Sequence, residues 1–153
     1  MTETTALKKI LVVCTGNTCR SPIAEALIRL ELKKKGLNTR VEVSSCGTAT
    51  RDGIPASSES VFVMRNREID ISTHRSRKLK PEFVKEAAVI LAMNPSHAEA
   101  LLAEYAEAKP KLITFNIPDP IGMSIRTYEE TLQVIQSELV KRWPEIISKL
   151  EAK

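Results

Sequence analysis

Short apolar runs alternate with segments of helical periodicity along most of the chain, and this alternation constrains the fold more than any other feature. Four apolar runs predict β-strands, at residues 9–14, 41–45, 88–93 and 111–115. Four helical patterns lie between and after them, at residues 22–36, 56–68, 95–107 and from residue 125 onward. Pro144 predicts a bend or a restart in the last helix. Strands separated by helices favour βαβ units and a parallel sheet.

The predicted elements account for one sheet with helices on both faces. No internal repeat, low-complexity tract or linker interrupts them, and 153 residues with 42% hydrophobic side chains can build one core. We therefore expect a single domain over residues 1–153, with a three-layer, doubly wound, four-stranded parallel sheet of flavodoxin-like order. Ligands of such α/β sheets bind beyond the carboxyl ends of the strands, where Cys14 and Asp119 both lie.

Composition narrows the range of compartments and partners. The apolar run at residues 10–13 is too short for an export signal or a membrane span, and the odd count of three cysteines favours free thiols in a reducing compartment. The net charge of +4 favours anionic ligands but is too small to predict a nucleic-acid partner. We expect a cytoplasmic monomer without a membrane partner. The basic run at residues 75–80 is interpreted as a solvated face, with steering of acidic substrates as the alternative.

The chemistry concentrates where the first strand meets the first helix. Ser21 is the expected N-cap of that helix, with Pro22 at its first position, and unpaired backbone N–H groups at a helix N-terminus favour phosphate. The connecting loop consists of Cys14, Thr15, Gly16, Asn17, Thr18, Cys19, Arg20 and Ser21.

Several residue types in this loop suit phosphoryl transfer. Gly16 and Asn17 tolerate left-handed backbone angles that turn N–H groups inward, and the guanidinium of Arg20 can bind phosphoryl oxygens in pairs. A thiol at Cys14 amid these positive groups should have a lowered pKa and act as a nucleophile.

The string CTGNTCRSP resembles the signature of the low-molecular-weight protein tyrosine phosphatases, and the resemblance extends to residues 45–48 (SCGT), 74–77 (HRSR) and 119–120 (DP). It implies that Cys14 forms a phosphocysteine, that Arg20 binds the phosphate and that Ser21 hydrogen-bonds the thiolate. Asp119 would be the general acid and would later activate the hydrolytic water. Without the resemblance, Asp119-Pro120 would be interpreted as a turn. No cofactor and no metal are expected.

The resemblance also implies two supporting contacts. A histidine that matches His74 braces the loop through Asn17, although a surface or capping role for His74 is the alternative. Cys19 would form a reversible disulfide with Cys14 that protects the nucleophile, and a small buried core residue is the alternative interpretation of Cys19. Cys46 replaces the usual alanine of the family and is interpreted as core packing.

The phosphorylated group that the enzyme takes depends on Thr18. Phosphotyrosine enzymes of the family carry isoleucine or leucine at that position and aromatic residues around the pocket, whereas Ile121 follows Asp119-Pro120 here and aromatic residues make up 4% of the chain. Thr18 and Gly122 resemble the protein arginine phosphatase branch, which predicts a protein phosphoarginine substrate. If Thr18 is a neutral variation, the substrate is protein phosphotyrosine.

Functions of other classes agree less well with the sequence. A related arsenate reductase would need further cysteines, and none follows Cys46. A phosphocarrier module of sugar transport would need neither Arg20 nor Asp119. A phosphopeptide-binding module without turnover would need the loop but not the acid.

Overall fold

The computed structural model describes residues 7–152; the outer limits of the predicted domain, residues 1–6 and 153, lie outside the described residues. The strands are β1 (Lys8–Cys14), β2 (Val41–Gly47), β3 (Ala87–Ala92) and β4 (Leu112–Thr114). The helices are α1 (Arg20–Lys34), α2 (Ser58–Arg65), α3 (Pro81–Glu86), α4 (Pro95–Glu104), the 3-10 helix η1 (Ala106–Lys111) and α5 (Ile125–Glu151). The strands pair in parallel in the order β2-β1-β3-β4, which confirms the predicted α/β sheet.

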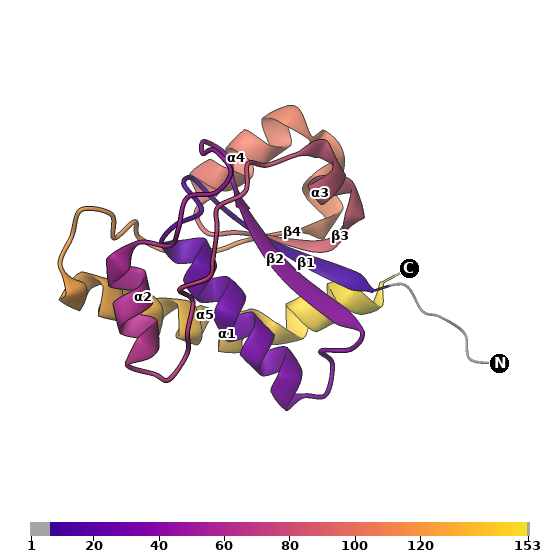
Figure 1. Cartoon of the computed structure of the whole chain (residues 1–153). Coiled ribbons are helices and arrows are strands. Elements are labelled where there is room, and N and C mark those ends of the chain that lie inside the picture. The colour runs from indigo at the N-terminus through magenta and orange to yellow at the C-terminus, as the bar shows by residue number, and fades with distance from the viewer. Residues whose placement is uncertain (1–6, 153) are drawn as a thin grey trace.

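Helices cover both faces of the sheet, with α1, α2 and α5 on one side and α3 and α4 on the other (Figure 1). The side chains of β1 alternate between the two layers: Ile10 and Val12 pack in the larger core, and Leu11 and Val13 in the smaller one. All four are buried, as expected for a strand covered on both faces.

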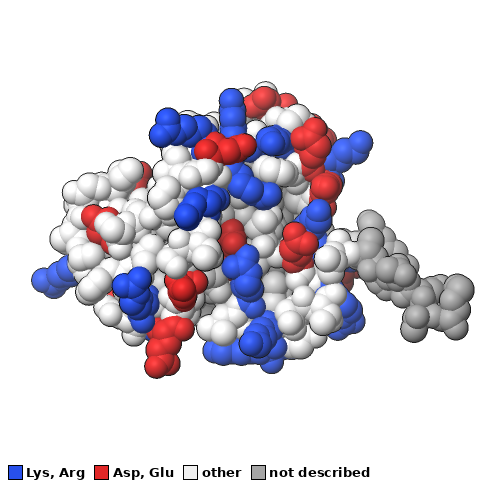
Figure 2. All heavy atoms as spheres, in the orientation of Figure 1, with Lys and Arg blue, Asp and Glu red and all other residues white. Residues whose placement is uncertain are grey.

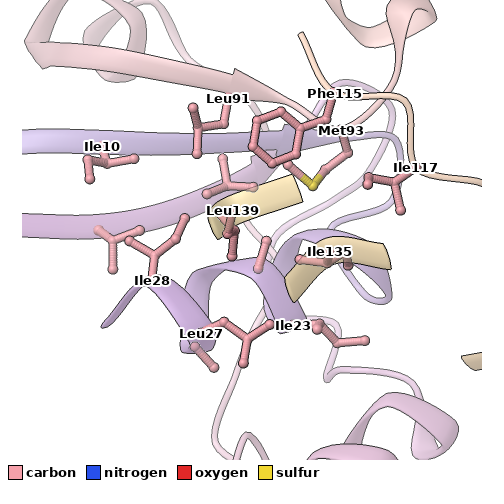
Figure 3. Packing of buried hydrophobic residues seen from close by; sticks show 14 of the residues in the cluster. Ile10, Ile23, Leu27, Ile28, Leu91, Met93, Phe115, Ile117, Ile135 and Leu139 are labelled. Carbon is pink, nitrogen blue, oxygen red and sulfur yellow. The ribbon is translucent and has the colours of Figure 1, made fainter. Parts of the chain in front are cut away.

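The larger core lies between the sheet and helices α1 and α5 (Figure 3). Leu91, Met93 and Phe115 extend from the β3 and β4 side toward Leu139 of α5, and Ile28 lies on the side of α1 that faces the strands. Because these residues come from distant parts of the sequence, their burial fixes α1 and α5 against the sheet and so fixes the loops at its edge.

The register of the sheet brings the carboxyl ends of the strands to one edge. Cys14 at the end of β1 pairs with Gly47 at the end of β2. The backbone N–H of Met93, just past β3, donates to the carbonyl of Val13 at 2.9 Å, and that of Ile117, beyond β4, donates to Met93 at 2.9 Å. Segments that follow all four strands therefore lie close together.

Several predicted helix limits were wrong. The helix expected at residues 56–68 is only Ser58–Arg65, because Ser57 caps it by accepting from the N–H of Ser60, and Glu68 has a left-handed φ of 61°. The helix expected at residues 95–107 ends at Glu104 and gives way to η1. The six-residue α3 was not predicted, since it is too short for a periodic pattern.

Of the bend or restart expected at Pro144, the restart does not occur, because α5 continues through the proline as one helix. A proline inside a helix removes one backbone hydrogen bond. Here the helix is anchored on both sides, by buried Ile135 and Leu139 before the proline and by Ile146 and Leu150 after it. Burial of these side chains outweighs the lost bond.

Basic and acidic side chains are mixed over the face of the molecule in Figure 2. In the basic run at residues 75–80, Arg75, Lys78 and Lys80 are exposed, as expected for a solvated face. Arg77 differs, since its guanidinium carbon lies 4.1 Å from the ring centre of Phe83. Within residues 7–152, no helix combines the length and the apolar content needed to cross a membrane.

Candidate active site

The loop at residues 14–21 connects the end of β1 to the start of α1 and is held from outside by backbone hydrogen bonds. The N–H of Thr48 donates to the carbonyl of Cys14 at 2.9 Å, and that of Ala49 donates to Thr15 at 3.0 Å. The N–H of Ser57 donates to the carbonyl of Thr18 at 2.9 Å. These bonds point carbonyls of the loop outward, which leaves its N–H groups free to turn inward.

The thiol of Cys14 lies at the base of the loop and is 3% exposed. Its sulfur is 2.8 Å from Ser21 Oγ and accepts from the backbone N–H of Asn17 at 3.2 Å. Burial raises the pKa of this thiol, against the lowering effects of Ser21, Asn17 and the charge of Arg20. The predicted fall in pKa was therefore wrong for the loop as it stands here, because the sequence did not show how deeply the thiol is buried.

Ser21 does not cap α1. The helix begins two residues before the predicted start at Pro22, at Arg20, and its N-cap residue Cys19 makes no side-chain capping bond. The hydroxyl of Ser21 instead contacts the sulfur of Cys14 and accepts from Asn17 Nδ2 at 2.8 Å. The predicted capping role was thus wrong, while the contact that the family resemblance implied between Ser21 and the thiol is present.

Asn17 connects the loop to its surroundings. It is fully buried and has a φ of 58°, the left-handed conformation that asparagine tolerates, whereas Gly16 has no positive φ. Besides Ser21, its Nδ2 donates to Ser45 Oγ at 2.9 Å, and its Oδ1 accepts from the N–H of Arg77 at 2.8 Å. Its backbone oxygen is 2.8 Å from His74 Nε2, which is the contact expected between these two residues.

Arg20 and Asp119 meet above the loop. The guanidinium of Arg20 is 5% exposed, and its Nη1 donates to the carbonyl of Ile117 at 2.9 Å. Its Nη2 lies 3.5 Å from Asp119 Oδ2. The side chain of Asp119 is about half exposed, and its other oxygen accepts from the N–H of Ile121 at 3.1 Å, so the residue both forms a turn and faces the site.

The three cysteines are all buried and free, and they divide between the two cores. Cys14 and Cys19 belong to the larger core, and Cys19 Sγ lies 3.4 Å from Tyr128 Oη and 3.6 Å from Ser57 Oγ. Cys46 packs in the smaller core on the other face of the sheet, which agrees with its interpretation as a core residue.

The family model of low molecular weight phosphotyrosine protein phosphatases matches residues 9–152. The chain belongs to this family. A probable low molecular weight protein-tyrosine-phosphatase, EpsP, from Ralstonia nicotianae is 35% identical over 85% of this chain and 90% of its own length. A protein-arginine-phosphatase from Geobacillus stearothermophilus is 39% identical over 78% of this chain and 83% of its own length.

A solved structure supports the same family membership. It is a cysteine-to-serine mutant of the YwlE arginine phosphatase with a phosphorylated active-site serine, which superposes with a TM-score of 0.84 at 30% identity, over 94% of this chain and 99% of the other. As a member of the low-molecular-weight phosphatase family, the protein is a hydrolase, and its relatives carry the names of both tyrosine and arginine phosphatases.

Two residues that contact the loop of this phosphatase were not found by sequence reasoning. His97 in α4 has Nε2 at 2.8 Å from Thr15 Oγ1 and 3.4 Å from Arg20 Nη2. A Cβ on Gly47 would lie 2.5 Å from the carbonyl oxygen of Thr15. Both residues lie at or just after the carboxyl end of a strand, and this position was the available signal for His97. Gly47 also lies in the stretch at residues 45–48 that the family resemblance included, but no contact with the loop was predicted for it.

A groove of the phosphatase lies away from this loop. It has a volume of about 1120 Å³ and runs between α1, β2 and the segment around residues 68–77, with Glu25, Arg29 and Arg75 among its lining. Cys14 and Arg20 do not line it. The candidate site therefore rests on the chemistry of the loop and not on cavity size. In the described part of the chain, no group of three or more His, Cys, Asp or Glu side chains is arranged to hold a metal ion.

Proposed function

We propose that this protein removes phosphate from phosphorylated side chains of proteins through a phosphocysteine on Cys14, and that its substrate is protein phosphoarginine. The observation that carries the proposal is the convergence of a buried thiol, a buried guanidinium and a carboxylate at one loop, with Arg20 Nη2 only 3.5 Å from Asp119 Oδ2. The combination supplies a nucleophile, a clamp for phosphoryl oxygens and a proton donor.

In the first step the sulfur of Cys14 attacks phosphorus, and the bond between phosphorus and the substrate nitrogen or oxygen breaks. The electron pair of that bond goes to the leaving group, which takes a proton from Asp119. The N–H of Asn17, the hydroxyl of Ser21 and the charge of Arg20 all favour the anionic sulfur. The inward N–H groups and Arg20 hold the oxygens of the transferring phosphoryl group.

In the second step water attacks the phosphocysteine. Asp119, now a carboxylate, takes a proton from that water, the bond between phosphorus and sulfur breaks, and inorganic phosphate leaves. Cys14 departs as a thiolate. The donors from Asn17 and Ser21 that stabilise this thiolate before it attacks phosphorus therefore also stabilise it when the phosphocysteine breaks. The half-exposed position of Asp119 suits both steps, because a carboxylate reached by solvent can exchange protons and orient water.

Thr18 supports phosphoarginine as the substrate. It lies within the loop, half-buried, with its hydroxyl 3.8 Å from Cys19 Sγ, and its polar side chain suits a guanidinium better than a phenol ring. The segment after Gly47 and the position after Pro120 contain no aromatic residue that could stack on such a ring. The similarity to the Geobacillus arginine phosphatase agrees with this choice.

A side-by-side turnover assay on phosphoarginine and phosphotyrosine peptides of one sequence tests the substrate. We expect the wild type to prefer phosphoarginine. Thr18→Ile should lower kcat/KM for phosphoarginine and raise it for phosphotyrosine, each by about 1–2 kcal/mol of transition-state free energy, since it replaces a hydroxyl by apolar area.

Two variants serve as references. Cys14→Ser should abolish turnover of both peptides while the protein still folds and binds phosphate, because a hydroxyl fits the same loop but is a poor nucleophile. Thr18→Ser, which keeps the hydroxyl, should keep the wild-type preference. A wild type that prefers phosphotyrosine, or an unchanged ratio in Thr18→Ile, would assign the protein to phosphotyrosine instead.

A further inference from the structure

His97 is a buried side chain whose position the proposed chemistry does not explain. It lies in the first turn of α4, it is 3% exposed, and its ring reaches from the opposite layer of the fold to the loop. Its Nε2 is 2.8 Å from the hydroxyl oxygen of Thr15 and 3.4 Å from Arg20 Nη2. It therefore touches both the first loop residue after the thiol and the guanidinium above it.

The partners of His97 determine where its proton lies. A guanidinium can only donate, so Nε2 must accept from Arg20, and the hydroxyl of Thr15 can donate to the same nitrogen. The ring proton then belongs on Nδ1, which is buried and has no hydrogen-bond partner among residues 7–152. A buried donor without a partner lowers stability, and such groups in native proteins often mark functional sites.

The charged groups that face His97 agree with a neutral ring. Arg20 from α1 and Asp119 from the segment before α5 have opposite effects on it, and burial with the charge of Arg20 lowers its pKa to about 4. A neutral acceptor can orient a guanidinium without compensating its charge. A carboxylate in place of His97 would add a second negative charge to that of Asp119, 3.5 Å from Arg20 Nη2, and would weaken the hold of Arg20 on a phosphoryl group.

We infer that His97 is a positioning residue: through Nε2 it fixes the guanidinium of Arg20 and the hydroxyl of Thr15, so that the loop is preorganised for the phosphoryl group. The inference rests on the phosphate-binding role of Arg20 in the proposed function. Arg20 Nη1 already donates to the carbonyl of Ile117. The contact of Nη2 with His97 is a second one, and together the two contacts set the plane of the guanidinium.

Inhibition by inorganic phosphate and turnover of a small aryl phosphate test this inference. His97→Leu keeps bulk but removes the acceptor, and we expect it to weaken phosphate inhibition about tenfold and to lower kcat/KM roughly 10- to 100-fold, chiefly through KM. His97→Gln places an amide oxygen near the position of Nε2 and should recover activity to within about threefold of wild type. Glu99→Gln, an exposed change in the same helix, should behave as wild type.

A purely structural role would give a different pattern. If His97→Leu bound phosphate as the wild type does, or if His97→Gln were as impaired as His97→Leu, the inference would be overturned. Should His97→Leu not fold, the comparison moves to His97→Asn, whose shorter amide does not reach the position of Nε2. His97→Asn must then show weaker phosphate inhibition and a lower kcat/KM, while His97→Gln stays close to the wild type. Equal values for the two variants would contradict the inference.

Arg20→Ala in the same assay separates this inference from the function on which it rests. If Arg20→Ala retained phosphate inhibition, the proposed role of Arg20 would fail. If Arg20→Ala lost it while every His97 variant kept it, only the role of His97 would fail.

Discussion

At the scale of single residues, the hydrogen bonds around Cys14 oppose the effect of burial on the pKa of its thiol. The amide Nδ2 of Asn17 can only donate, so the oxygen of Ser21 accepts from it and the hydroxyl proton of Ser21 remains for the sulfur of Cys14. This arrangement favours the thiolate against the burial that opposes it. Buried Asn17 thus orients the hydroxyl of Ser21, and that hydroxyl can donate to the sulfur of Cys14.

The acid role of Asp119 gives a prediction at this scale. Asp119→Asn cannot supply a proton, so kcat should fall by about 10²- to 10³-fold for substrates with basic leaving groups and far less for a nitrophenyl phosphate. The measurement is a series of aryl phosphates of graded leaving-group pKa. Asp70→Asn makes the same chemical change at an aspartate that only caps a local turn and should match the wild type. Equal losses across the series would remove Asp119 from this role.

The cysteines give a second prediction. Mild peroxide should oxidise Cys14 to a sulfenic acid, which condenses with the thiol of Cys19 and releases water, and a dithiol should restore activity. Cys19 is the expected partner, because Cys46 packs on the other face of the sheet. Cys19→Ala should recover less activity than Cys46→Ala, as measured after a peroxide and reductant cycle. Mass spectrometry that found Cys14 joined to Cys46 would contradict this pairing.

Residues of the site differed in how far the sequence could predict them. Cys14, Arg20 and Ser21 belong to one contiguous motif, so their proximity followed from the loop itself. His97 comes from another strand end, and only tertiary packing decides that its ring turns toward Arg20. The pKa of Cys14 also depends on burial, which no local pattern contains.

At the scale of elements, apolar strands were predicted well and helix ends poorly. The two central strands are largely buried and contain continuous apolar runs, as in β3. Helix ends depend on a single cap, and the serine that looked like the cap of α1 makes contacts with Cys14 instead. At Pro144 the tertiary packing of α5 outweighs the local preference of proline.

Gly47 yields a prediction that belongs to the contact between β2 and the loop. In Gly47→Ala the new Cβ would lie 2.5 Å from the carbonyl oxygen of Thr15 and 2.8 Å from a methyl carbon of Thr50, so backbone must move. We expect a loss of about 1–3 kcal/mol in the free energy of unfolding and weaker phosphate binding, measured by urea denaturation and by inhibition.

Gly16→Ala is the matched control for Gly47→Ala. Its Cβ would meet only Thr18 Oγ1, at an ordinary 3.5 Å, and Gly16 has no left-handed φ. Its free energy of unfolding should therefore change much less. If the two alanine variants were equally stable, the close approach between Gly47 and the loop would not be a constraint on the fold.

At the scale of the whole molecule, strand order decides which segments can act together. With β1 and β3 in the centre, the loop after β1 lies beside the start of α4, and the segment after β4 extends far enough to bring Asp119 to Arg20. The alternation of strands and helices predicted this sheet, and the general rule for ligands at strand ends predicted that Cys14 and Asp119 lie at one edge of it. Neither the alternation nor the rule predicted that both layers of helices contribute side chains at this edge, Arg20 of α1 from one side and His97 of α4 from the other.

His97, which lies where the two layers of helices meet, makes the stability of the whole protein depend on pH. The pKa of His97 is about 4 in the folded protein and near 6.5 when the residue is free in water, so between these values the unfolded chain binds the extra proton. The contribution of neutral His97 to stability is complete above about pH 6.5 and is lost as pH falls toward 4. From these two pKa values we expect a loss on the order of 1 to 2 kcal/mol near pH 5.

Urea denaturation of the wild type and of His97→Gln across this pH range measures the effect. Glutamine does not titrate, so the difference in unfolding free energy between the two proteins should be constant above about pH 7 and should shift in favour of the variant as pH falls from 6.5 to 4. Acid-labile contacts elsewhere, including the carboxylates, are common to both proteins and cancel in the difference. A difference that stays flat through this window would mean that His97 takes up its second proton at the same pH in the folded and the unfolded protein, so burial and the charge of Arg20 would not hold the folded ring neutral.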